Sequence, residues 1–127
     1  MKRIKGRYTY KDKEKDNNET SIPGEWTVDE LANMISNNHF AMLILKGYDI
    51  IDKKTGCKAY YPASALTLYP NETIPKQEGN KIVIPTYFRR NMIAFSDNQE
   101  NPDELVKVDC LVDLNDEFLY VSISKNE

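Results

Sequence analysis

Two short stretches of the chain combine aromatic rings with positive charges, and these side chains have the clearest potential for binding chemistry. They are Lys58-Ala59-Tyr60-Tyr61 and Tyr87-Phe88-Arg89-Arg90. Rings that stack on bases, beside cations that neutralise phosphates, are what single-stranded nucleic acid requires. In a strand, Arg89 and Arg90 point to opposite faces, so only one of them can share a face with Phe88. The alternative is that the rings belong to the core or its rim and that the arginines are ordinary surface charges.

The N-terminal segment is a second source of positive charge. Residues 1–16 carry seven basic and three acidic side chains, a net charge of +4. Since the whole chain has a formal net charge of −3, residues 17–127 carry −7. A basic arm on an acidic body is one way to bind a polyanion, and a solvated, frayed terminus is the simpler alternative. The predicted nucleic-acid contact residues are Tyr87, Phe88, Arg89, Arg90, Lys58 and Tyr60, assisted by Lys2, Arg3, Lys5 and Arg7.

Patterns typical of catalysis or metal binding do not stand out in the sequence. His39 is the only histidine, and just past a predicted helix it is expected to bond the last carbonyl groups. The five glycines are scattered, and no group of His, Cys and acidic residues has the spacing of a transition-metal site. The carboxylates near the C-terminus are expected to be solvated, with an acid/base pair or a calcium site as alternatives: Asp109, Asp113, Asp116 and Glu117. We therefore expect a non-catalytic protein without cofactor or metal.

The two cysteines, Cys57 and Cys110, are expected to be free thiols. Cys110 lies within an apolar alternation, and Cys57 follows a glycine in a predicted turn. A disulfide between them is the alternative. No apolar segment typical of a secretory signal follows the basic N-terminus, and the longest apolar run, Phe40 to Leu45, is far shorter than the roughly 20 residues of a membrane-spanning helix. We expect a cytoplasmic protein that does not bind membranes.

The clearest local signal predicts a helix over residues 27–37. Thr27 and Glu30 have the spacing of a capping box, in which each side chain accepts a bond from the other residue's backbone N–H. The Asn37-Asn38 pair suits a left-handed stop. An apolar stripe at helical spacing predicts the side that packs on a sheet: Val28, Leu31, Met34 and Ile35.

Most of the remaining chain favours short strands separated by turns. Residues 2–10 form the first predicted strand, and residues 11–20, which contain no apolar side chain, are predicted to be a mobile loop. The turn Asp52–Gly56 has an Asp to open it and a Gly for positive φ. Further predicted strands cover residues 40–51, 58–61, 66–69, 81–84 as far as Pro85, and 87–95.

The C-terminal residues predict a hairpin that turns at Asn115-Asp116. Apolar side chains alternate along both of its arms. The predicted register pairs Val112 with Leu119, Cys110 with Val121 and Val108 with Ile123, all facing the core.

These elements predict one domain over residues 1–127. At 127 residues and 40% hydrophobic content the chain can form a core without disulfides. The expected class is α+β and mostly β: a small barrel or a strongly bent antiparallel or mixed sheet, with one packed helix.

The layout of the whole chain is similar to that of PrgU-type proteins, small regulators carried on conjugative plasmids of Gram-positive bacteria. The similarity lies in the chain's size, its early helix, its β-rich body, and the stretch Lys46–Ile51 followed by the Asp52–Gly56 turn, which fits a pseudobarrel hairpin. The resemblance implies a PUA-like fold and an RNA-binding regulatory function, and it transfers no individual functional residue.

Three functions remain open from the sequence. The first is a non-catalytic regulatory module from a mobile element that binds single-stranded RNA. The second is a protein-binding inhibitor or immunity-type protein, whose acidic body and exposed tyrosines would contact a protein partner. The third is a small enzyme of unknown class.

Overall fold

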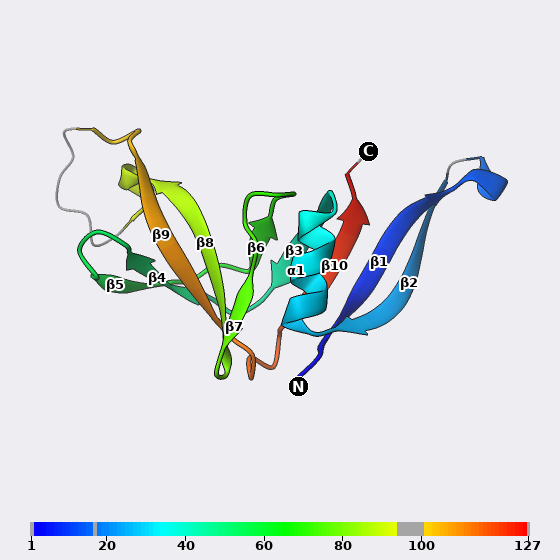
Figure 1. The fold of residues 1–127 in the computed structure, drawn as a ribbon, viewed down its shortest axis with the longest axis horizontal. Coiled ribbons are helices and arrows are strands. Elements are labelled where there is room, and N and C mark those ends of the chain that lie inside the picture. Colours follow the sequence, from blue (N-terminus) through cyan, green and yellow to red (C-terminus); the bar gives the residue numbers. More distant parts are fainter. Residues whose placement is uncertain (1, 17, 94–100, 127) are drawn as a thin grey trace.

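Ten strands and one α-helix make up the part of the chain that the computed structural model describes, residues 2–16, 18–93 and 101–126. The strands form two five-stranded sheets (Figure 1), sheet A in the order β2-β1-β10-β3-β6 and sheet B in the order β5-β4-β9-β8-β7. The prediction of a mostly β domain with one helix is confirmed, whereas a closed barrel is wrong. The elements are β1 Ile4–Asp12, β2 Asn18–Trp26, α1 Val28–Ser36, β3 His39–Ile44, β4 Tyr48–Asp52, β5 Lys58–Tyr61, β6 Ala65–Leu68, β7 Lys76–Glu78, β8 Lys81–Arg89, β9 Leu105–Asp113 and β10 Tyr120–Lys125, with short 3-10 helices at Lys13–Lys15 and Arg90–Met92.

One long, bent hairpin joins the two sheets. Strand β3 in sheet A continues into β4 in sheet B, and the returning strands β5 and β6 keep the same register on both sides of the bend. Between the sheets, the Leu45 N–H donates to the Ser64 carbonyl at 3.2 Å. At the far end the Asp52 N–H donates to the Cys57 carbonyl at 2.9 Å, and Gly56 has φ 77°. The predicted turn at Asp52–Gly56 is therefore confirmed.

Helix α1 covers the core side of the sheets, and its apolar stripe is fully buried at Val28, Leu31 and Ile35. The helix begins with the predicted capping box: the Glu30 N–H donates to Thr27 Oγ1 at 3.1 Å, and the Thr27 N–H donates to Glu30 Oε1 at 3.0 Å. These bonds from Thr27, with Arg3 nearby, lower the pKa of the Glu30 carboxyl. The predicted stop is also confirmed, because Asn38 has φ 62°.

Replacing Thr27 with alanine removes the oxygen that accepts the Glu30 N–H. We expect Thr27→Ala to lower the free energy of unfolding by about 1 kcal/mol, the usual cost of losing an N-cap. Urea unfolding followed by circular dichroism measures it. The matched control is Asn33→Ala, on the exposed side of α1, which keeps the cap and improves helix propensity. Equal midpoints for Thr27→Ala and the wild type would contradict the role of the cap.

Strand β8 is longer than the sequence predicts, because it continues through Pro85 to Arg89. Proline lacks the backbone N–H and is tolerated only where that N–H is not needed by a neighbouring strand. Strand β7 pairs with β8 only as far as Val83, so Pro85 lies on a free edge. Only part of the predicted strand 87–95 is described; residues 87–89 extend β8, and a 3-10 turn follows.

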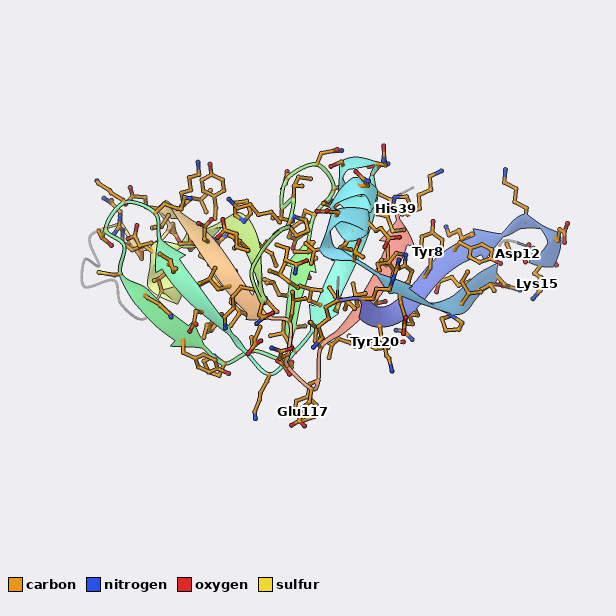
Figure 2. All side chains as sticks on the ribbon, turned by 60° about the horizontal axis from the view of Figure 1, so that its bottom comes forward. Tyr8, Asp12, Lys15, His39, Glu117 and Tyr120 are labelled. Atoms are coloured by element: carbon orange, nitrogen blue, oxygen red, sulfur yellow. The ribbon has the colours of Figure 1, made fainter. Side chains whose placement is uncertain are left out.

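The segment 11–20, predicted as a loop, belongs largely to the hairpin of β1 and β2. Lys11 pairs with Glu19 and Asp12 pairs with Asn18. Antiparallel pairing satisfies the backbone without apolar side chains, which is why composition alone misled the prediction. Figure 2 shows the tip of this hairpin, with Asp12 and Lys15, projecting from the body. Its mobility stays a prediction.

The predicted C-terminal hairpin is wrong, although the predicted buried side chains are largely right. Strand β9 pairs with β4 and β8 in sheet B, whereas β10 pairs with β3 and, in parallel, with β1 in sheet A. Two successive turns carry the chain between the sheets: the Asp116 N–H donates to the Asp113 carbonyl and the Leu119 N–H to the Asp116 carbonyl, each at 3.1 Å. The buried set is Val108, Cys110, Val112, Val121 and Ile123, and Leu119 is only half-buried.

Both cysteines are free, as predicted, and their environments differ: Cys57 is exposed and Cys110 is buried. Burial, together with the charge of Asp109, raises the pKa of the Cys110 thiol to about 12. Because the thiolate is the reactive form, we expect the folded protein to react with one equivalent of Ellman's reagent and the unfolded protein with two. Rapid reaction of two thiols in the folded state would contradict this assignment.

Candidate nucleic-acid interface

Tyr87 and Arg89 share the outer face of sheet B, the face turned away from the core. Their neighbours on β8, Ile82 and Ile84, are buried and lie opposite Val112 and Cys110 of β9. Since side chains alternate along a strand, Tyr87 and Arg89 point to the opposite side. Tyr87 lies opposite Lys107, and its side chain is 59% exposed.

Phe88 and Arg90 do not lie on that outer face. The Phe88 ring is partly buried against the core, and its centroid lies 6.4 Å from that of Tyr61 in an edge-on arrangement. Arg90 forms an ion pair with Glu104, with Nη2–Oε2 at 2.6 Å and Nε–Oε2 at 3.0 Å. Of the four consecutive residues predicted to bind nucleic acid, the structure therefore places Tyr87 and Arg89 on the outer face, and Phe88 and Arg90 away from it.

Lys58 and Tyr60 of β5 also face outward on sheet B. Tyr60 lies opposite Asp49 of β4, and Lys58 lies opposite Ile51. The Lys58 ammonium is 3.5 Å from the Asp49 carboxylate, so its charge is partly compensated. Four of the residues predicted from the sequence thus share one face of one sheet: Lys58, Tyr60, Tyr87 and Arg89.

Two lysines that the prediction missed complete this face. Lys107 lies opposite Tyr87, at the roughly 5 Å Cβ separation of a direct cross-strand pair. Lys53 extends from the end of β4 beside it, with its N–H donating to the Lys107 carbonyl at 3.1 Å. Lys107 lies between Val106 and buried Val108, which both face the core. The apolar alternation of this strand could therefore have predicted that Lys107 faces outward. We call Lys53, Tyr87, Arg89 and Lys107 the outer cluster.

The charges of the outer cluster are only partly neutralised. Lys53 Nζ lies 3.0 Å from Asp109 Oδ2. Within the described part of the chain, no carboxylate lies in ion-pair distance of Arg89 or Lys107. Among the residues that the structure describes, two cations beside an exposed tyrosine therefore have no anionic partner.

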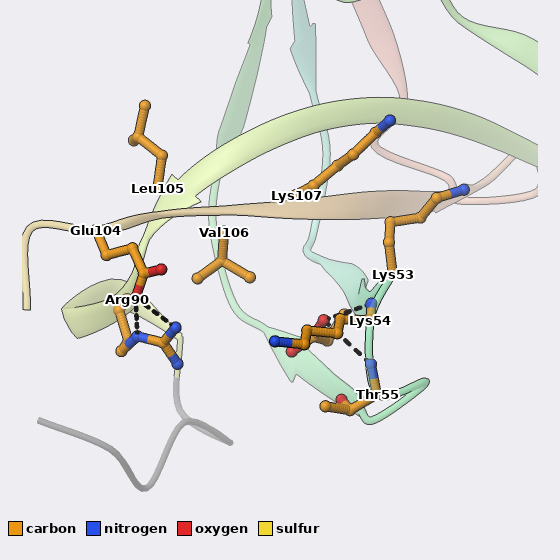
Figure 3. A pocket seen from close by; sticks show the side chains of 9 residues that line it. Lys53, Lys54, Thr55, Arg90, Glu104, Leu105, Val106 and Lys107 are labelled. Atoms are coloured by element: carbon orange, nitrogen blue, oxygen red, sulfur yellow. Dashed lines mark hydrogen bonds and ion pairs between the residues drawn. The ribbon is translucent and has the colours of Figure 1, made fainter. Parts of the chain in front are cut away.

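A pocket of about 540 Å³ opens at the same end of sheet B (Figure 3). Its acidic groups already have partners: Glu104 holds Arg90, and the Asp52 carboxylate accepts the Lys54 N–H at 2.8 Å. The lining residues are Asp52, Lys53, Lys54, Thr55, Arg90, Glu104, Leu105, Val106 and Lys107. Beyond Lys53 and Lys107, the two positive charges of the pocket, Lys54 and Arg90, are balanced by the carboxylates of Asp52 and Glu104, so the pocket adds no net positive charge to the outer cluster.

The basic arm lies in sheet A and does not join the outer cluster. Its basic side chains have other partners: Lys2 Nζ donates to Asn115 Oδ1 at 2.7 Å, Arg3 pairs with Glu30 of α1 at 2.9 Å, and Arg7 Nε lies 3.4 Å from Ser122 Oγ of β10. Lys5 lies opposite Glu25. The prediction that the arm assists the same contact surface therefore has no geometric support.

His39 has the structural role predicted from the sequence. Its Nδ1 lies 3.1 Å from the Met34 carbonyl and 2.9 Å from the Asn37 carbonyl, at the end of α1. Its Nε2 lies 3.0 Å from the Tyr8 hydroxyl, and Figure 2 shows the two side chains together. The histidine thus ties the helix end to β1.

The acidic residues near the C-terminus act on the backbone and on nearby lysines. Asp113 accepts the Asn115 N–H at 2.8 Å, and Asp109 pairs with Lys53. In the described ranges no three His, Cys, Asp or Glu residues are grouped closely enough to hold a metal ion.

Comparison of the chain with protein-family models, curated proteins and solved structures found no match. No helix among the described residues is long and apolar enough to span a membrane.

Proposed function

We propose that this protein is a non-catalytic module that binds single-stranded RNA through the outer cluster on sheet B. The observation that carries the proposal is the position of Tyr87 between Arg89 and Lys107 on an exposed face, with both cations unpaired among the described residues. An exposed ring accepts an unpaired base by stacking, and neighbouring cations neutralise the flanking phosphates.

The overall negative charge of the protein opposes this function, so the local charge has to overcome it. Four cations on this face, Lys53, Lys58, Arg89 and Lys107, exceed the two carboxylates beside them, Asp49 and Asp109. The other charges of the face form two ion pairs, Lys81 with Asp113 and Lys76 with Glu78, and leave this excess unchanged. Local charge matters more than net charge, because interactions between exposed charges are screened beyond about 10 Å at 0.1 M salt.

A salt titration tests the proposal. Binding of a fluorescein-labelled 12-nucleotide single-stranded RNA is measured by anisotropy at 50 and 200 mM KCl. About three phosphate contacts predict a slope near −2 in log K against log salt, or a roughly 20-fold loss of affinity over this range. No binding at 50 mM KCl, or affinity independent of salt, would refute the proposal.

A protein partner is the second candidate, and a different surface favours it. The outer face of sheet A exposes Met42, Ile44 and Tyr120, which lie on the adjacent strands β3 and β10. Exposed apolar side chains gathered on one face are typical of protein contact sites. If the RNA titration shows no binding, an inhibitor or immunity-type role through this face becomes the leading hypothesis.

We include in this proposal the similarity to PrgU-type regulators and the PUA-like fold that this similarity implies. A regulatory RNA-binding role agrees with the outer cluster, and the bent hairpin of β3–β6 falls at the segment on which the resemblance rests.

A further inference from the structure

The bend between the two sheets carries another pair of exposed rings, with a lysine between them. The side chains of Tyr60 and Phe118 are 58% and 55% exposed. Tyr60 Oη donates to the Lys46 carbonyl at 3.3 Å, and Lys46 Nζ lies 6.0 Å from the centroid of the Phe118 ring. Three segments far apart in the chain therefore bring two rings and one cation together, and we call Lys46, Tyr60 and Phe118 the bend platform.

Gly47 and Asp116 hold the bend platform in place. A Cβ atom on Gly47 would overlap the Tyr60 ring, so the ring lies directly on the glycine backbone. The Asp116 carboxylate accepts the Lys46 N–H at 2.9 Å through Oδ2 and the Phe118 N–H at 2.8 Å through Oδ1. The backbone segments that carry Lys46 and Phe118 are thus fixed before any ligand arrives, which reduces the ordering cost of binding.

The bend platform and the outer cluster lie on the same side of the structure. Tyr60 faces outward on sheet B, in the cross-strand row of Asp49, Leu111 and Val83. Tyr87 lies four residues further along β8 than Val83, which is about 13 Å, and three strands across, which is about 14 Å. A ligand that contacts both must therefore be an extended chain, and single-stranded sites of about 4–16 nucleotides are long enough.

We infer that a single strand of RNA bound at the outer cluster continues across the outer face of sheet B to the bend platform. One base stacks on Tyr60 or Phe118 there, and Lys46 binds an adjoining phosphate. This inference rests on the function proposed above and adds a minimum ligand length. Four carboxylates oppose it: Asp49 lies opposite Tyr60, and Asp113, Asp116 and Glu117 line the hollow beside Lys46 and Tyr60. The Glu117 carboxylate is exposed, and Figure 2 shows this residue at the bend.

Two variants test the bend platform without touching the outer cluster. Phe118→Ala removes one ring from an exposed loop, and Gly47→Ala displaces the Tyr60 ring. The probe is labelled U12 RNA at 50 mM KCl, and thermal unfolding verifies that each variant is folded. We expect Phe118→Ala to weaken binding about 5- to 150-fold, the range for losing one stacked base. Gly47→Ala is expected to weaken it in the same direction.

Two matched variants complete the experiment. Tyr69→Ala removes a ring of similar exposure from the residue that follows β6, and we expect no change in affinity. Glu117→Gln removes one of the opposing charges, and we expect tighter binding. If the wild type binds U12 but Phe118→Ala, Gly47→Ala and Glu117→Gln all bind it with unchanged affinity, the bend platform is not part of the site and the proposed function survives. If the wild type does not bind U12, the proposed function itself fails, and the inference fails with it.

Discussion

Replacing Val121 with aspartate is expected to abolish the folded state. Val121 is completely buried in β10, opposite Leu43 of β3 and beside Gly6 of β1. The Gly6 backbone packs so closely against Val121 that even a Cβ at Gly6 would overlap it. An unpaired carboxylate at this fully buried position would be removed from solvent, and its burial costs several kcal/mol, comparable with the 5–15 kcal/mol that stabilise a typical domain. Circular dichroism and thermal unfolding should show no cooperative transition.

The adjacent residue supplies the control. Ser122 points to the outer face of sheet A, where Arg7 Nε lies 3.4 Å from its hydroxyl. Ser122→Asp introduces the same charge beside a cation, and we expect a change in unfolding free energy within about 0.5 kcal/mol. A cooperative unfolding transition for Val121→Asp close to that of the wild type would show that β10 is not a core strand.

Local signals in the sequence were sufficient for two features whose bonds join near neighbours in the chain. The capping box of α1 depends on Thr27 and Glu30, three residues apart, and the Asp52–Gly56 turn depends on five consecutive residues. In both, the bonds form between near neighbours in the chain. Their residue types therefore predicted the structure correctly.

Pairing between strands could not be predicted in the same way. The alternation in β9 and β10 correctly indicated that Val112 and Val121 are buried, but it is satisfied by any apolar partner strand. In the structure Val112 lies opposite Ile82 and Val121 lies opposite Leu43. The hairpin prediction failed because burial is encoded in one strand, whereas the choice of partner depends on the whole fold.

In the candidate site, too, contacts between different strands could not be predicted from the sequence. Alternation predicted opposite faces for Arg89 and Arg90 in a strand, whereas in the structure only Arg89 belongs to β8 and Arg90 lies in the 3-10 turn that follows. It could not reveal that Glu104 pairs with Arg90, or that Lys107 lies opposite Tyr87, because both partners come from another strand or loop. The basic arm was grouped with the site because of its charge, and the topology places it in the other sheet.

Removing the ring and both free cations of the outer cluster should nearly abolish RNA binding. Tyr87→Ala alone is expected to cost about 1–3 kcal/mol, the contribution of one stacked base. Arg89→Ala with Lys107→Ala removes about two phosphate contacts, which should reduce the slope of log K against log salt by roughly 1.4. All three side chains lie on the exposed face of sheet B, so the triple variant should keep the unfolding temperature of the wild type within a few degrees.

The two kinds of substitution should produce different signatures in one titration with U12 RNA. Tyr87→Ala lowers affinity equally at 50 and 200 mM KCl, because stacking releases no counterions, whereas the double cation variant loses most affinity at low salt. The matched control is Lys125→Ala with Tyr69→Ala, one exposed cation at the end of β10 and one exposed ring just after β6, and it should bind like the wild type. If the control and the triple variant lose the same affinity, the attraction comes from the protein as a whole rather than from the outer cluster.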